Sequence, residues 1–118
     1  APPVPPGVTS EAVRAAFEAA FPAGPSRAAL ARSFAANYRK VAGETSRALA
    51  LPGENPLRSL GGVLAETTRL NRLVLPDSAE ARAFFRALAG LLEPLKITEA
   101  GQSVAIWLII AEGLEACS

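Results

Sequence analysis

The chain has 118 residues, with 12 Lys and Arg against 11 Asp and Glu, no His and one Cys. The absence of His excludes Ser–His–Asp and Cys–His catalysis, His-ligated zinc and His-held haem, and a single Cys excludes an internal disulfide or a Cys-cluster metal site. Half of the residues are hydrophobic, so the chain has the composition of one folded domain with a buried core. We therefore expect no metal and no cofactor.

The first eight residues differ from the rest of the chain. Four prolines between Pro2 and Pro6 favour an extended arm over a helix or a central strand. We predict a Pro-rich arm over residues 1–8 and a single helical domain over residues 9–118. A small residue followed by a Pro-rich spacer is what often remains after a signal peptide is cut. Export to the periplasm or outside the cell and a cytoplasmic location both stay open.

Two helices are predicted in the first half of the chain. The first spans about 11–21, with Thr9 or Ser10 as its cap, because Val13, Phe17 and Phe21 form one apolar stripe before a Pro- and Gly-containing turn. The second spans about 27–51 with Ser26 as its cap, since apolar side chains recur every three or four residues until Pro52 and Gly53.

A third helix is predicted over about 56–75, with Asn55 as cap and Pro56 at its first position. Gly61 and Gly62 are costly inside a helix, so either another helix packs closely there or the helix is broken there.

A fourth helix is predicted to begin with a capping box from Asp77 to Glu80. Pro94 is expected to end or kink it. Its wide apolar face includes Phe84, Phe85 and Leu88.

The fifth helix is predicted from about 98 to 116. It is apolar on all sides, which is typical of a buried helix, although one side could instead be an interface. Its longest apolar run is Val104–Ala111, whereas a membrane-spanning helix needs about 20 residues, so we predict no transmembrane segment. These five helices predict a compact all-α bundle with a largely buried C-terminal helix.

The clearest polar constellation lies on the second predicted helix. Four cationic side chains fall within an arc of about 100° opposite its apolar stripe, namely Arg32, Arg39, Lys40 and Arg47. Residues 27–72 carry eight basic and three acidic side chains, although the chain as a whole has a net charge of only +1. Such a face could bind phosphates or nucleic acid, or simply face water.

Apolar side chains form the second set of candidates. Trp107, Ile106 and Ile110 on the fifth helix, with Phe84 and Phe85 on the fourth, could form an interface or line a pocket for an apolar small molecule. Core packing is the simpler interpretation. A mean hydropathy of +0.24 favours some contact between apolar surfaces, with a protein partner or a second copy of the chain.

No catalytic constellation emerges from the remaining residues. Glu112 and Glu115 are neighbours on one helix but have no His to complete a di-iron site. Cys117 has no base beside it that would lower its pKa. We therefore expect a non-catalytic helical interaction or structural domain that self-associates or binds a protein, with anion or nucleic-acid binding through the second helix as the alternative.

Overall fold

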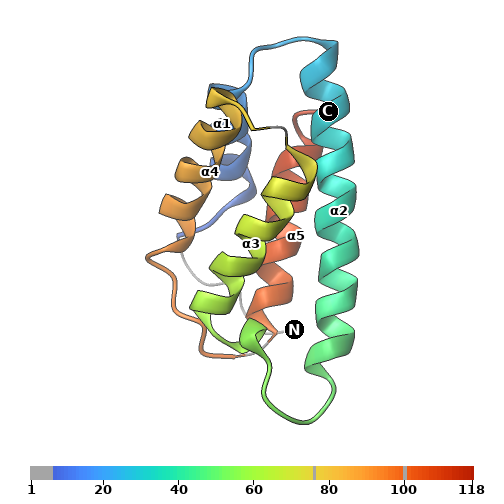
Figure 1. The fold of residues 1–118 in the computed structure, drawn as a ribbon, viewed down its shortest axis with the longest axis vertical. Helices are drawn as coiled ribbons and strands as arrows, with labels where there is room; N and C mark the ends of the chain where they lie inside the picture. Colours follow the sequence, from blue (N-terminus) through green and yellow to red (C-terminus); the bar gives the residue numbers. More distant parts are fainter. Residues whose placement is uncertain (1–6, 76, 100) are drawn as a thin grey trace.

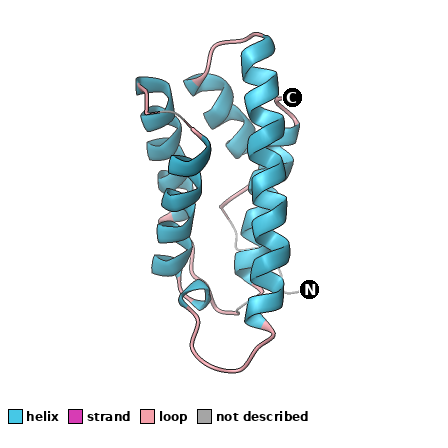
Figure 2. Ribbon diagram, turned by 45° about the vertical axis from the view of Figure 1, so that its right-hand side comes forward, coloured by secondary structure: helices cyan, strands magenta, loops and turns pink. Residues whose placement is uncertain are grey.

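The computed structural model describes residues 7–75, 77–99 and 101–118, which form helices joined by loops, with no strand among them (Figure 2). The elements are α1 (Ser10–Ala20), α2 (Pro25–Leu49), the short 3-10 helix η1 (Pro56–Arg58), α3 (Leu60–Val74), α4 (Ala79–Leu92) and α5 (Gln102–Glu115). The predicted all-α bundle of five helices is confirmed. Prolines 2–6 of the predicted arm lie outside the described residues, whereas Val8 at its end is buried against the core.

The first two helices begin close to where the sequence indicates. Thr9 caps α1, because its hydroxyl accepts a hydrogen bond from the Ala12 N–H at 3.1 Å. Helix α2 begins at Pro25, two residues earlier than predicted, so Ser26 lies inside the helix instead of capping it. Proline is favoured at the first helical position because a backbone N–H there has no partner within the helix, so its loss costs no hydrogen bond.

The third predicted helix is divided into η1 and α3, so the helix is broken near its two glycines. Asn55 caps only η1, and Ser59 then caps α3 by accepting from the Gly62 N–H at 3.2 Å. A Cβ on Gly62 would lie 1.8 Å from the Pro56 carbonyl oxygen, whereas one on Gly61 would meet nothing within 4 Å. The break therefore precedes the glycines, and Gly62 admits the backbone of η1.

The last two helices begin later than predicted. Ser78, not Asp77, caps α4, because its hydroxyl accepts from the Ala81 N–H at 3.0 Å. Helix α5 begins at Gln102, whose side-chain oxygen accepts from the Thr98 and Glu99 N–H groups at 2.8 and 3.3 Å. These two backbone donors are thus satisfied outside the helix, which explains the shorter α5.

The helices form an elongated bundle of 44 × 24 × 24 Å. Helix α5 packs along α2 and against α1, while α4 packs mainly against α1 and more sparsely against α3 (Figure 1). No helix in the described part of the chain has the length and apolar character that crossing a membrane requires.

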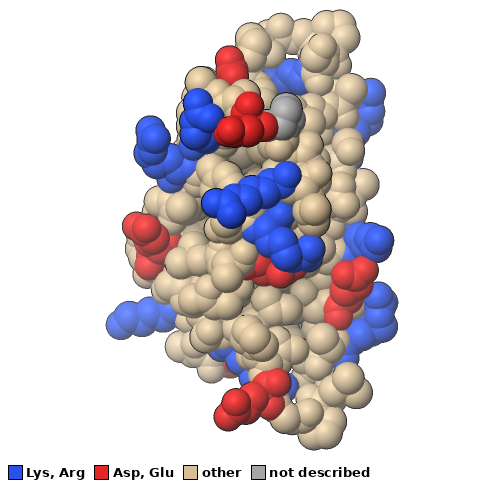
Figure 3. Space-filling model, in the orientation of Figure 1, with Lys and Arg blue, Asp and Glu red and all other residues tan. Residues whose placement is uncertain are grey.

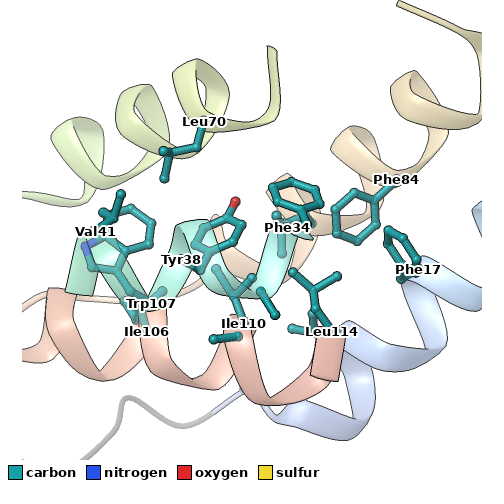
Figure 4. Close-up of a cluster of buried hydrophobic side chains, with 14 of the residues drawn as sticks. Phe17, Phe34, Tyr38, Val41, Leu70, Phe84, Ile106, Trp107, Ile110 and Leu114 are labelled. Carbon is teal, nitrogen blue, oxygen red and sulfur yellow. The ribbon is translucent and has the colours of Figure 1, made fainter. Parts of the chain in front are cut away.

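A row of aromatic rings runs through the core from Trp107 to Phe17 (Figure 4). The ring centroids of Tyr38 and Trp107 are 6.0 Å apart, and those of Phe34 and Tyr38 are 5.1 Å apart. Phe84 meets Phe34 at 5.9 Å and Phe17 at 5.2 Å, both edge to face. This row joins α5, α2, α4 and α1 through contacts that aromatic rings favour.

The C-terminal helix is largely buried, as predicted. Ile106, Trp107, Ile110 and Leu114 are each 0% exposed, whereas Val104, Leu108 and Ile109 on its outer side are only half-buried. Gly113 lets α1 cross closely, because a Cβ there would lie 2.7 Å from the Ser10 carbonyl oxygen.

Candidate binding pocket

An open pocket of about 650 Å³ lies between α3 and α4, near the short connection that joins them. Helix α3 contributes Thr68, Asn71, Arg72 and Leu75 to its lining. Asp77 of the connection and Ala81, Arg82, Phe85 and Arg86 of α4 complete it. The volume is in the range of sites that hold small molecules.

Side-chain size and helix direction explain why space remains here. Phe84 packs against the rings of α1 and α2. The next two residues of α4, Phe85 and Arg86, instead line the pocket shared with α3. Thr68 and Ala81, which also line the pocket, have small side chains that leave part of this space unfilled.

The mouth of the pocket is cationic. Arg72 comes from α3, and Arg82 and Arg86 come from adjacent turns of α4. Arg82 pairs with Asp77, with 2.7 Å between Nη1 and Oδ1, but both side chains are more than half exposed. Arg72 and Arg86 have no ion pair with any described residue. Lys and Arg atoms gather over the upper parts of α3 and α4 in Figure 3, with acidic atoms beside them.

A buried amide forms part of the pocket lining. Asn71 is 1% exposed, and its Nδ2 donates to the Thr67 carbonyl oxygen at 2.8 Å. Its Oδ1 and the Tyr38 hydroxyl are the only buried side-chain N or O atoms in the described residues that have no hydrogen-bond partner. Burial raises the pKa of Tyr38 far above its ordinary value, an effect that the nearby Asn71 amide partly opposes.

The cationic face predicted on α2 is exposed, but one of its members is already paired. Arg39 donates to both carboxylate oxygens of Glu115 at 2.6 Å, from Nε and Nη2. The hydrogen bonds from Arg39 lower the pKa of the Glu115 carboxyl, and those bonds raise the pKa of Arg39. Arg32, Lys40 and Arg47 are exposed and form no ion pair with the described residues.

Four of the five apolar candidates lie in the packed core, which is the simpler interpretation of the sequence. Trp107, Ile106, Ile110 and Phe84 are each 0% exposed, and the indole Nε1 donates to the Thr45 hydroxyl at 3.1 Å. Of the five candidates, only Phe85 lines a described pocket. The other four are core residues because the facing helices fill the space around them.

The remaining sequence candidates do not meet in one site. Glu115 is committed to Arg39, and the described residues contain no group of three His, Cys, Asp or Glu side chains placed to hold a metal ion. Cys117 is buried at the end of α5, with its Sγ 3.4 Å from the Gly113 carbonyl oxygen. Burial, and next the charge of Glu18, raise the pKa of this thiol, which disfavours the reactive thiolate.

Sequence reasoning missed most of the pocket. Of the lining residues, only Phe85 is a site candidate from the sequence, and none of the arginines is. One signal was present in the sequence, because Arg82 and Arg86 are four positions apart and therefore share a face of their helix. Which helix lies opposite that face depends on tertiary packing.

Comparisons with models of protein families, with curated proteins and with solved structures found no match to this chain.

Proposed function

We propose that the chain is a non-catalytic helical interaction domain, and that it binds an anionic group of its ligand in the pocket between α3 and α4. One observation carries this proposal. Arg72 and Arg86 come from different helices, line the same pocket and have no carboxylate partner among the described residues. Guanidinium groups bind carboxylates and phosphates through paired, charge-assisted hydrogen bonds.

The cationic face of α2 is the competing anion site. Its unpaired members are spread along the helix, since Arg32 and Arg47 are fifteen positions apart, which corresponds to about 22 Å. Such spacing suits an extended polyanion such as nucleic acid better than a single anionic group. The experiment must therefore compare the two surfaces.

Inorganic phosphate is the simplest probe. We expect its addition to ¹⁵N-labelled protein, at constant ionic strength, to shift amide resonances of residues 68–75 and 81–86 in a saturable way. The double substitution Arg72→Gln and Arg86→Gln should abolish these shifts. The matched control, Arg32→Gln with Arg47→Gln, removes the same charge from α2 and should leave them intact. Shifts confined to residues 32–47, or no saturable shift at all, would contradict the proposal.

Self-association and export remain predictions. Light scattering over a range of protein concentrations tests the first, and a strict monomer would exclude a homo-oligomer. Fractionation of the cells that make the native protein tests the second.

A further inference from the structure

The lining of the pocket between α3 and α4 changes in character between its more buried part and its mouth. Leu75 and Ala81 are each 6% exposed and Phe85 is half-buried, so apolar side chains form the more buried part. Arg72 and Arg86 are exposed, so their cationic groups lie at the solvent edge. A ligand that enters this pocket therefore meets charge at the mouth and apolar surface further in.

The two polar side chains deeper in the lining donate within their own helix. The Thr68 hydroxyl donates to the Leu64 carbonyl oxygen at 2.9 Å, and the Asn71 amide donates to the Thr67 carbonyl oxygen at 2.8 Å. A ligand with a polar body, such as a sugar phosphate, would have to bury hydroxyl groups against apolar side chains. That burial is costly when the hydroxyls find no partner. The lining therefore favours an apolar body behind the anionic group.

The arginines of the mouth are not equally free to bind this anionic group. Arg82 pairs with Asp77, whose carboxylate offsets its charge. Arg72 and Arg86 have no ion pair with any described residue, and they come from the two helices that form the pocket. These two guanidinium groups are therefore the partners that the lining offers to one carboxylate.

We infer that the ligand of this pocket is an amphipathic carboxylate, a small acid with an aliphatic or aromatic body. Arg72 and Arg86 hold its anionic head at the mouth. Its body packs against Phe85, Leu75 and Ala81, so the apolar surface contributes to affinity along with the charge. This inference rests on the proposed function, because it names the ligand class of the same pocket.

A homologous series of straight-chain acids tests the apolar contact. Acetate, butyrate and hexanoate carry the same head and differ only in the number of methylene groups. At constant ionic strength, we expect the affinity to rise about two- to fourfold for each methylene that enters the pocket, because apolar surface is buried. Saturation is followed through the amide resonances of residues 68–75 and 81–86. Hexanol keeps the apolar chain but lacks the charge, and should bind about tenfold more weakly than hexanoate.

Two single substitutions distinguish the pocket from the general surface of the protein. Phe85→Ala removes the ring that the chain contacts, so the affinity ratio of hexanoate to acetate should fall about threefold or more. The matched control, Leu73→Ala, removes an exposed apolar side chain of α3 that does not line the pocket, and should leave that ratio unchanged. Because each ratio is taken within one variant, a general loss of stability cancels out of the comparison.

The outcomes separate this inference from the proposed function. If phosphate shifts the pocket resonances but hexanoate binds no better than acetate, the anion site stands and the amphipathic ligand class is wrong. An affinity ratio that falls equally in Leu73→Ala and Phe85→Ala would also overturn the inference. If hexanoate binds equally well to the double variant Arg72→Gln with Arg86→Gln, or if neither phosphate nor any acid gives saturable shifts, the proposed function fails together with the inference.

Discussion

The half of the bundle in which α1, α2 and α5 meet α4 is closely packed with aromatic rings, whereas an open pocket lies on the side on which α3 approaches α4. In the first region, five rings contact one another in sequence and the Trp107 indole has its acceptor in Thr45. In the second, a pocket separates the helices and the Asn71 amide oxygen has no partner among the described residues. The closely packed core and the proposed binding pocket thus lie in different parts of one small domain.

Two adjacent phenylalanines give the largest test of this division. Phe84→Ala should lower the free energy of unfolding by about 3–5 kcal/mol, because it empties the centre of the ring contacts. Phe85→Ala, one residue along, removes a half-buried ring from a pocket and should cost about 1 kcal/mol. Chemical denaturation measures both, and equal losses would contradict the division of the bundle.

The glycine pair at the start of α3 gives a test of intermediate size. Gly62→Ala places a Cβ against the Pro56 carbonyl and should destabilise the protein by about 1–3 kcal/mol. Its control, Gly61→Ala, meets open space and should be neutral or stabilising by up to about 1 kcal/mol. Thermal unfolding of the two variants distinguishes them, and a tolerated Gly62→Ala would mean that η1 can move away from α3.

Two buried side chains of α2 compare a polar group that has a hydrogen-bond partner with one that has none. Thr45→Val leaves the Trp107 N–H without an acceptor and should cost about 1–2 kcal/mol. Tyr38→Phe removes a hydroxyl that has no partner, so the variant should be as stable as the unsubstituted protein or more so. A clear loss of stability in Tyr38→Phe, measured by chemical denaturation, would show that this hydroxyl bonds to Asn71 in solution.

The smallest effect is expected at the exposed ion pair between Arg39 and Glu115. Both side chains are more than 40% exposed, so Arg39→Gln should cost about 0.2–1 kcal/mol at neutral pH and less at high salt. Because the folded state lowers the Glu115 pKa, the contribution is present above the unfolded-state pKa and is lost as the pH falls through the folded-state pKa. The difference between the two proteins should therefore vanish in acid, and a constant difference at all pH values would exclude this origin.

The sequence predicted the helices well because their signals are local. Apolar spacing and the prolines located all five, and Thr9, one of the two caps expected for the first helix, is its cap. Errors of one to four residues occurred where an unexpected side chain accepts from the backbone, as with Ser78 before α4 and Gln102 at the start of α5. The pocket was missed because Arg72 and Arg86 are brought together only by tertiary packing, and periodicity within one helix carries no information about its neighbour.

The position of α5 along the chain has a consequence for the order of folding. This helix supplies Ile106, Trp107 and Ile110 to the centre of the core, and near its end Cys117 meets Arg14, 103 positions earlier. A ribosome makes α1 and α2 before α5, the helix that both of them contact. Their apolar faces therefore stay exposed, or are shielded by a chaperone, until residues 102–117 have been made and the core can form.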